Sequence, residues 1–448
     1  MTRVLHITPH LSGGVGAVLL EILKFYQNDA EWKHEIIVFE KLSDSEKKYF
    51  KGFRGYILWT RDQKIIEKKI KQSDIVQIEW WNHPLIYLFL LKFPFPKCRV
   101  SICSHISGFH RPQIITRNLI RFSDIFLATT KATLEIGMLQ DSENIDLKRR
   151  IEVINYPMNF ERFKNFHKKS HSTFNIGYVG TLDYSKLHRS FLSIASKINI
   201  PNNNFIMCGK DIDDKIYQES LNFSKVNFTF TGLVENVVPV YEQLDVLGYP
   251  LDPNHFGTGE QVIREAMFVE LPIVAFDNPC ERHIITSGFN GLLVSTEEEY
   301  VEAVENLYGD KKLRTDLGKN ARRSVIDELN PGRVFNELGR KYTKLMMKDK
   351  SKKQFPFSVE EFNKGDDGDI GAKLFIESLG HEKSTFLTSF ASTSEVSQYA
   401  ADVEISNCEK ALKLKNKGSL FQYLRYFPND KHLNYWAGLI KENENMER

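Results

Sequence analysis

Residues 245–294 hold the side chains and backbone groups with the clearest potential for chemistry. Thr258 and Gln261 have the spacing of a capping box, which predicts a helix that begins near Glu260, after an apolar strand and a glycine-containing loop. Backbone N–H groups at such a helix end lack partners and carry partial positive charge, so they suit a phosphate or a sugar hydroxyl. Glu265 lies inside the predicted helix, where its carboxylate could accept two hydrogen bonds from a diol. An ordinary strand–loop–helix with a surface glutamate also fits this pattern.

Several short motifs follow one another in this segment: Asp245, Pro250, Glu265-Ala266-Met267, Pro272-Ile273-Val274 and Asn290-Gly291-Leu292-Leu293-Val294. Their order and spacing resemble the nucleotide-sugar-binding region of retaining glycosyltransferases with the GT-B fold, in family four (glycosyl transferases group 1). The resemblance implies that the chain binds a nucleoside-diphosphate sugar and that Glu265 binds its ribose. No single motif is specific, but the complete set favours this family over an ordinary strand–loop–helix.

A second glycine-rich loop follows the first predicted strand, residues 4–8. Gly13, Gly14 and Gly16 would let the backbone approach a ligand closely, and the helix predicted after them would favour a diphosphate. The loop also resembles a dinucleotide fingerprint, but Leu19 replaces the third fingerprint glycine, so an NAD site is a weak alternative. The glycosyltransferase resemblance implies that the three glycines approach the donor diphosphate.

His105 follows directly after the predicted strand 99–104. Ligands bind at the carboxyl ends of the strands in open α/β sheets, so a histidine there is expected to face a cleft. A structural histidine is the alternative. The resemblance implies that His105 lies beside the transferred sugar and the acceptor. His6 alternates with apolar residues, which also fits a core position.

Residues 177–186 match the start of the family's second domain, where an arginine and a lysine five residues later hold the donor phosphates. Lys186 fits the lysine position, and the resemblance implies that it binds the phosphates. Thr181 stands at the arginine position, and its hydroxyl can give a hydrogen bond without a charge. The resemblance further implies that backbone groups of the loop with Gly232 and Val234 hold the nucleotide base.

The loop before the predicted helix departs from the family pattern at a second place. Gly257 stands where the family has its first glutamate, which contacts the transferred sugar. Glu260 lies five residues before Glu265, about 140° away around an ideal helix, so it does not replace that glutamate. We expect backbone groups of the loop to hold the sugar instead, from the stretch Gly257, Thr258, Gly259 and Glu260. The two departures predict an altered donor sugar or reduced activity.

Apolar strand candidates alternate with helical stretches through residues 1–330 of the 448-residue chain. This alternation predicts parallel sheets with helices on both faces, and two successive sets predict two doubly wound domains. We therefore expect an α/β fold with two Rossmann-like (GT-B) domains facing a cleft: an acceptor-side domain over residues 1–165 and a nucleotide-sugar domain over residues 166–348. Residues 349–448 are predicted to form a small helical extension packed on the second domain.

The sequence indicates no metal and no cofactor besides the donor substrate. Its 13 histidines and five cysteines show no ligand spacing. The cysteines are therefore interpreted as buried thiols in a reducing compartment. The N-terminus enters a predicted strand directly, and the longest apolar run, residues 85–91, is far too short to cross a bilayer, so we expect a cytoplasmic protein.

Charge is distributed unevenly along the chain. Residues 1–169 hold 27 Lys and Arg against 18 Asp and Glu, although the net charge of the whole chain is only +2. A basic first half favours an anionic partner, either a lipid-linked diphosphate or the anionic inner face of a membrane. An ordinary solvated basic face is the alternative. We expect no nucleic-acid partner.

The leading prediction is a retaining glycosyltransferase that moves a sugar from a nucleoside-diphosphate sugar to a carbohydrate or lipid-linked hydroxyl acceptor. The resemblance implies attack on the face that the diphosphate leaves, without a metal or a dedicated protein base, and a setting in cell-surface polysaccharide or glycoconjugate synthesis. A catalytically weak pseudo-transferase that acts as a scaffold or partner subunit is the alternative, motivated by Gly257 and Thr181. An NAD enzyme is the third hypothesis.

Overall fold

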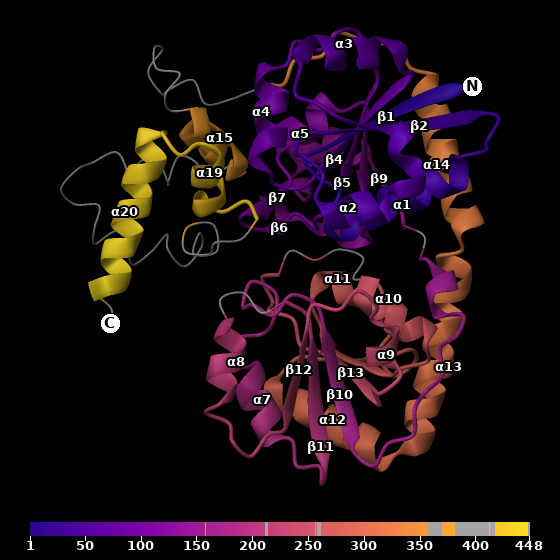
Figure 1. Ribbon diagram of the computed structural model, residues 1–448, viewed down its shortest axis with the longest axis vertical. Helices are drawn as coiled ribbons and strands as arrows, with labels where there is room; N and C mark the ends of the chain where they lie inside the picture. The colour runs from indigo at the N-terminus through magenta and orange to yellow at the C-terminus, as the bar shows by residue number, and fades with distance from the viewer. Residues whose placement is uncertain are drawn as a thin grey trace. The chain divides into compact units, whose positions relative to one another are not determined.

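The computed structural model describes residues 1–156, 158–210, 214–255, 257, 261–356, 370–380, 412 and 417–446. Within them the chain forms two compact units, each with its own parallel sheet. Unit 1 comprises residues 1–129, 133–154 and the described residues from 337 onward, and unit 2 comprises residues 130–132 and 155–336 (Figure 1). In the part of the chain described here, no helix is both long enough and apolar enough to span a bilayer.

Seven parallel strands form the sheet of unit 1, in the spatial order β3-β2-β1-β4-β5-β8-β9. They are β1 (Thr2–Thr8), β2 (Trp32–Val38), β3 (Ile57–Trp59), β4 (Ile75–Trp80), β5 (Val100–Ser104), β8 (Ile125–Ala128) and β9 (Ile151–Val153). The α-helices between them are α1 (Gly13–Tyr26), α2 (Asp44–Tyr49), α3 (Gln63–Gln72), α4 (Pro84–Lys92), α5 (Arg117–Phe122) and α6 (Ile145–Lys148). Short 3₁₀ helices η1 (Lys51–Tyr56), η2 (Lys131–Glu135), η3 (Gly137–Leu139) and η4 (Ser142–Asn144) and an antiparallel pair, β6 (Phe109–His110) with β7 (Gln113–Ile114), complete the connections.

Local sequence determines where several of these helices begin. Ser43 and Glu46 form a reciprocal capping box at the start of α2. The side chain of Asp62 accepts a hydrogen bond from the backbone N–H of Ile65 at the start of α3, and His83 caps α4 in the same way. These caps satisfy backbone donors that a helix end otherwise leaves unpaired.

Six parallel strands form the sheet of unit 2, in the order β12-β11-β10-β13-β14-β15. They are β10 (Phe174–Val179), β11 (Asn203–Cys208), β12 (Phe228–Gly232), β13 (Val246–Tyr249), β14 (Ile273–Phe276) and β15 (Leu292–Val294). Its helices are η5 (Phe160–Phe163), α7 (Phe191–Lys197), α8 (Lys215–Ser220), α9 (Val238–Tyr241), α10 (Gln261–Phe268), α11 (Pro279–Arg282), α12 (Glu297–Gly309) and α13 (Lys311–Glu328), and α14 (Pro331–Met346) continues into unit 1. Each sheet reverses its strand order at its first strand, as doubly wound folds do. The predicted α/β fold of two Rossmann-like domains is therefore confirmed.

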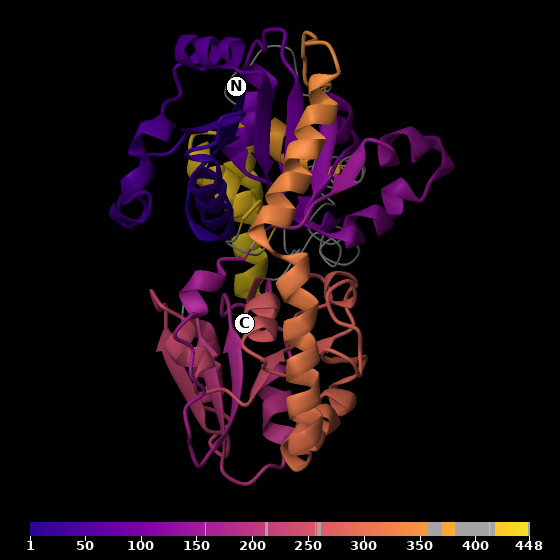
Figure 2. The ribbon, with the colours of Figure 1, turned by 90° about the vertical axis from the view of Figure 1, so that its right-hand side faces the viewer.

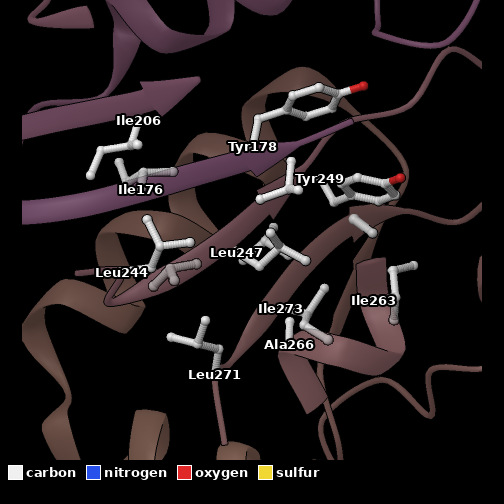
Figure 3. Packing of buried hydrophobic residues seen from close by; sticks show 14 of the residues in the cluster. Ile176, Tyr178, Ile206, Leu244, Leu247, Tyr249, Ile263, Ala266, Leu271 and Ile273 are labelled. Atoms are coloured by element: carbon white, nitrogen blue, oxygen red, sulfur yellow. The ribbon is translucent and has the colours of Figure 1, made fainter. Parts of the chain in front are cut away.

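The apolar core of unit 2 holds α10 against the sheet. Ile263 and Ala266 are completely buried, and Figure 3 shows Ala266 beside Ile273 of β14. Tyr178 and Tyr249, near the ends of β10 and β13, stack with ring centres 5.5 Å apart. Close packing of this kind resists displacement, so α10 presents its polar residues from a fixed position.

The C-terminal region is helical, as predicted, but the expectation that it packs on the second domain is wrong. The helices α15 (Ile370–Ser378), α19 (Leu420–Tyr426) and α20 (Lys431–Met446) belong to unit 1, where α15 and α19 lie against α4 (Figure 1). Phe375 and Tyr423 share the apolar core cluster of that unit. The physical reason is α4 itself, which is apolar on nearly every face and therefore needs cover on the side away from the sheet.

Tyr423 provides a test of this docking. Its hydroxyl donates a hydrogen bond of 2.7 Å to Oδ1 of Asn82, and both residues are buried. Replacing Tyr423 with phenylalanine leaves a buried amide oxygen one hydrogen bond short, which is expected to lower the free energy of unfolding by about 1–3 kcal/mol. Urea unfolding measures the change. Tyr435→Phe is the matched control, because that side chain is 48% exposed and its replacement should change stability by less than about 0.5 kcal/mol.

Candidate active site

Loops that follow β10, β12 and β13 gather at one edge of the unit 2 sheet, because parallel strands end on the same side. Thr181 is exposed there, and its carbonyl oxygen accepts a hydrogen bond of 2.9 Å from the hydroxyl of Tyr178. The ammonium group of Lys186 lies 5.5 Å from the centre of the Tyr249 ring. A cation therefore stands at the edge where such folds bind ligands.

The loop after β12 contains the two residues predicted to hold a nucleotide base. Gly232 has a φ of +67°, which favours glycine, and a Cβ there would meet nothing within 4 Å. Val234 is half-buried and packs on the apolar core of unit 2. The backbone N–H of Gly209, after β11, donates to the carbonyl oxygen of Gly232 at 3.1 Å. The space beside the Cα of Gly232 is thus open, although its carbonyl oxygen is engaged, and Val234 anchors the loop.

Glu265 is 5% exposed, and both of its carboxylate oxygens accept hydrogen bonds within unit 2. Oε1 accepts from Nη1 of Arg162 at 2.9 Å, and Oε2 accepts from the hydroxyl of Tyr241 at 3.0 Å. Burial raises the pKa of Glu265, while the charge of Arg162 and the hydrogen bond from Tyr241 oppose that rise. A carboxylate has about four acceptor positions, so these bonds orient the group without using its full capacity.

The described part of the loop before α10 is turned inward. The backbone N–H of Gly257 donates to Nδ1 of His255 at 2.9 Å, and its carbonyl oxygen accepts from the thiol of Cys280 at 3.1 Å. Nε2 of His255 lies 3.1 Å from Oε2 of Glu281. Both backbone groups of Gly257 are therefore engaged by protein atoms. The other three predicted loop residues, Thr258, Gly259 and Glu260, lie outside the described residues.

His105 lies at the carboxyl end of β5 in unit 1. Its Nε2 is 2.7 Å from Oε2 of Glu79, and its backbone N–H donates to the carbonyl oxygen of Trp80 at 2.8 Å. The Trp81 ring lies 6.2 Å from the His105 ring and 5.1 Å from the ring of His10. Trp81 therefore connects His105 to the loop that leads into α1.

The glycines of that loop have different tasks. Gly13 has a φ of +70°, and a Cβ added to Gly13 or Gly14 would meet nothing within 4 Å. Gly16 is buried, and a Cβ there would lie 1.7 Å from the carbonyl oxygen of Leu11. The surroundings of Gly13 and Gly14 thus leave room for a ligand, whereas the close contact with Leu11 requires glycine at position 16.

Sequence reasoning missed the side chains that hold Glu265 and His105. Arg162 and Tyr241 lie 103 and 24 residues before Glu265, and no spacing indicated either contact. Glu79 did leave a signal, since it is a charged residue in a completely buried strand. Among the described residues, Glu79, Cys103 and His105 also bring three side chains of metal-ligand type within 4.8 Å, which sequence spacing did not indicate. Glu79 and His105 are joined by a hydrogen bond between Oε2 and Nε2.

His10 predicts a pH dependence of stability. Burial and the charge of Lys417 lower the pKa of His10 to about 4, whereas a histidine in an unfolded chain has a pKa of about 6.5. The unfolded state therefore binds the proton first, so the stability contributed by neutral His10 is complete above about pH 6.5 and is lost as the pH falls toward 4. We expect His10→Gln to flatten the pH dependence of the free energy of unfolding across this window. His167→Gln, at an exposed position, is the control and should leave the slope unchanged.

Comparisons with known sequences identify related proteins. The family model described as Glycosyl transferases group 1 matches residues 159–324. The capsular polysaccharide biosynthesis glycosyltransferase CapM of Staphylococcus aureus is 23% identical over 233 residues, which cover 47% of this chain and 60% of that protein. The putative glycosyltransferase EpsD of Bacillus subtilis (strain 168) is 25% identical over 204 residues, covering 44% of this chain and 52% of that protein. The matches thus span between 52% and 60% of the relatives' own lengths.

Comparisons with solved structures identify the same fold. Anabaena HepE in complex with UDP and glucose matches with a TM-score of 0.63 at 13% identity, covering 77% of this chain and 100% of that chain. A variant of S. aureus TarM in complex with fondaparinux, alpha-GlcNAc-glycerol and UDP matches with a TM-score of 0.61 at 11% identity, covering 78% and 100%. At these identities the likeness establishes the fold, which is GT-B.

Proposed function

We propose that this chain transfers a sugar from a nucleoside-diphosphate sugar to a hydroxyl acceptor with retention of configuration, because the model of the glycosyl transferases group 1 family matches residues 159–324. The acceptor is a carbohydrate or a lipid-linked carbohydrate, and the setting is cell-surface polysaccharide synthesis. The name of the S. aureus relative supports that setting, and the UDP and glucose bound to HepE support the donor class. The observation that carries the proposal is a cation and an oriented carboxylate, Lys186 and Glu265, within the segment that matches the family.

Each side chain has a proposed task in this reaction. Glu265 accepts hydrogen bonds from the donor ribose, and Lys186 binds the donor phosphates. Gly13 and Gly14 bring backbone N–H groups to the diphosphate, and His105 orients the sugar and the acceptor. The bond between the anomeric carbon and the diphosphate oxygen breaks, the acceptor oxygen forms its bond to the anomeric carbon on the same face, and the departing diphosphate takes the proton of the acceptor hydroxyl. Preorganised cations and amide groups stabilise the charge on the departing diphosphate, so the proposed reaction requires no metal and no protein base.

A donor screen tests the proposal. The full chain is incubated with UDP-, GDP- and ADP-linked sugars and a panel of sugar and lipid-linked acceptors, and release of the nucleoside diphosphate is measured. We expect acceptor-dependent release from one donor class, with a product of retained configuration by NMR. Release that no acceptor accelerates, or a product of inverted configuration, would contradict the corresponding part of the proposal.

A catalytically weak scaffold is a second candidate, because specific observations favour it. Thr181 replaces a phosphate-binding arginine, and both backbone groups of Gly257 are engaged by protein atoms. Calorimetry with UDP, GDP and ADP separates the two functions: binding of one of them with a Kd below about 1 mM supports the transferase, and absence of binding to all three supports the scaffold.

The exposed Thr181 allows a gain-of-function prediction. Thr181→Arg places a guanidinium beside the proposed phosphate site, where a charge-assisted hydrogen bond contributes about 1.5 kcal/mol or more. We expect the affinity for the preferred nucleoside diphosphate to rise about tenfold, measured by calorimetry. Thr181→Gln is the control, because it offers hydrogen bonds without the charge and should change affinity by less than about threefold. An equal gain in both variants would mean that charge at this position does not act on the phosphates.

A membrane surface is the proposed location of the acceptor, and it would place the chain at the cytoplasmic face. Residues 41–72 hold ten Lys and Arg against four Asp and Glu. The same segment exposes Tyr49, Trp59 and Ile65, by 53%, 55% and 43%. Basic side chains attract anionic headgroups, and exposed aromatic rings suit the interface. Co-sedimentation with vesicles that contain anionic lipid tests this contact, and equal binding to neutral vesicles would contradict it.

A further inference from the structure

A layer of buried polar side chains crosses one face of the unit 1 sheet. His34 on β2, His6 on β1 and Gln77 and Glu79 on β4 are each no more than 2% exposed, and His105 continues the layer at the end of β5. The strand registers place them in a row, because β1 lies between β2 and β4, and β4 pairs with β5. Helix α14 runs along this unit (Figure 2), and its Tyr342 donates to Oε1 of Gln77 at 2.7 Å. Burial of polar groups costs free energy unless each group has a hydrogen-bond partner, so these side chains are expected to bond to one another.

The hydrogen bonds of this layer converge on one carboxylate. Nε2 of His6 is 2.8 Å from Nδ1 of His34, and Nδ1 of His6 is 2.7 Å from Oε1 of Glu79. Nε2 of Gln77 donates to the same oxygen at 2.8 Å. Nε2 of His105 is 2.7 Å from the other oxygen, Oε2. Glu79 therefore joins His105 to a chain of hydrogen bonds that runs from β4 through His6 on β1 to His34 on β2.

The positions of the protons follow from these contacts. Burial would raise the pKa of Glu79, but the hydrogen bonds from His105 and His6 lower it to about 2, so the group is a carboxylate at neutral pH. A carboxylate only accepts hydrogen bonds, so the three facing nitrogens donate to it. His6 then accepts at Nε2 from Nδ1–H of His34. In this arrangement the atom of His34 that lacks a hydrogen bond, Nε2, is an unprotonated ring nitrogen. No N–H group of His34's ring is then buried without an acceptor.

The consequence for His105 is a fixed ring. Donation from Nε2 to Glu79 makes Nδ1 the acceptor of a neutral His105, and it orients the imidazole about its own side-chain torsions. The choice of which histidine nitrogen carries a proton is set by the hydrogen bond that the other makes.

We propose that Glu79 is a positioning residue for His105: it holds the imidazole as the Nε2–H tautomer and fixes the orientation of the ring for its contact with the bound sugar or acceptor. The proposal rests on the function proposed above for His105. His6 and Gln77 support it by satisfying the second oxygen of the carboxylate, which keeps the charge buried and the geometry rigid.

The wild-type protein tests the geometry without any substrate. In full-length protein labelled with ¹⁵N-histidine, imidazole protons in strong hydrogen bonds to a carboxylate are expected downfield and protected from exchange. One-bond and long-range ¹H–¹⁵N correlations then report the nitrogen that carries each proton, and His105→Gln identifies the resonance of His105. We expect the proton of His105 on Nε2 and that of His6 on Nδ1. A proton on Nδ1 of His105 would overturn the proposal.

Kinetics test the consequence. Glu79→Gln keeps the shape of the side chain, but its amide has only one acceptor oxygen. His6 and His105 each donate to a separate oxygen of Glu79, so one of them loses its acceptor. We expect kcat to fall about 5- to 100-fold, as for loss of one well-placed hydrogen bond, while the KM for the donor changes by less than about threefold. Tyr342→Phe is the matched control: it removes a hydrogen bond at the far side of Gln77 and should leave both kcat and the His105 resonance unchanged.

The two readouts separate this proposal from the proposed function. If no donor is turned over, the function fails, and the wild-type spectrum still decides the geometry. If transfer is observed and Glu79→Gln retains kcat within about threefold, the positioning role is wrong and the function stands. A Glu79→Gln protein that does not fold leaves the decision to the wild-type spectrum.

Discussion

Replacement of Glu265 by alanine is expected to lower affinity for the donor nucleotide by about 100-fold or more. The proposed contact is a pair of hydrogen bonds from the ribose hydroxyls to a charged group, each contributing about 1.5–3 kcal/mol, and 1.4 kcal/mol corresponds to a factor of ten. The carboxylate is already held by Arg162 and Tyr241, so little conformational entropy is lost when the ribose binds. Calorimetry with the preferred nucleoside diphosphate measures the loss.

A control is needed because Glu265 also supports its own helix. Without the carboxylate, Arg162 and the buried Tyr241 lose their partner, which is expected to lower stability by about 1–3 kcal/mol. Met267→Ala, in the same helix and also buried, should destabilise unit 2 by a comparable or larger amount through a cavity. If Met267→Ala also abolishes binding, or if Glu265→Ala keeps affinity within about threefold, Glu265 does not bind the ribose.

The fold followed from the sequence because its signals are local. Short apolar runs that alternate with helical stretches require parallel sheets with helices on both faces, and both sheets have that form. The sequence did not predict the surface against which α15 and α19 pack. An amphipathic pattern shows that a helix must bury one face, but the surface that receives it is set by uncovered apolar area elsewhere, here on α4.

For the candidate site, as for the fold, the sequence predicted the local structure but not the tertiary contacts. The position of Glu265 in a helix was confirmed, because apolar spacing is encoded within a few residues. The predicted cap, Thr258, lies outside the described residues. The contacts of the Glu265 carboxylate depend on η5 and α9, which the chain supplies from distant positions. Glu79 was within reach of the sequence, since a charged residue in a buried parallel strand needs partners on the neighbouring strands. Those partners, His6 and His105, become evident when β1, β4 and β5 are placed side by side.

Replacement of Lys186 by alanine has the second large expected effect: a fall of about 10- to 100-fold in affinity for the preferred nucleoside diphosphate. A charge-assisted hydrogen bond to phosphate contributes about 1.5–3 kcal/mol, and Thr181 supplies no second charge to compensate. Because the interaction is ionic, raising the salt concentration should weaken binding of the wild type more than that of the variant. Calorimetry at two salt concentrations measures both effects, and Lys186→Arg should retain most of the affinity.

The loss must be distinguished from a general change in charge or packing. Lys197→Ala is the matched control in unit 2, because that side chain is 45% exposed and is paired with Glu297 at 3.1 Å. It should change affinity by less than about twofold. The contact between Lys186 and the Tyr249 ring is a cation–π interaction at a partly exposed site, whose loss should lower stability by only about 0.5–1 kcal/mol. Equal losses of affinity in the two lysine variants, or an unchanged salt dependence in Lys186→Ala, would remove Lys186 from the phosphate site and leave the helix and loop amides to hold the diphosphate.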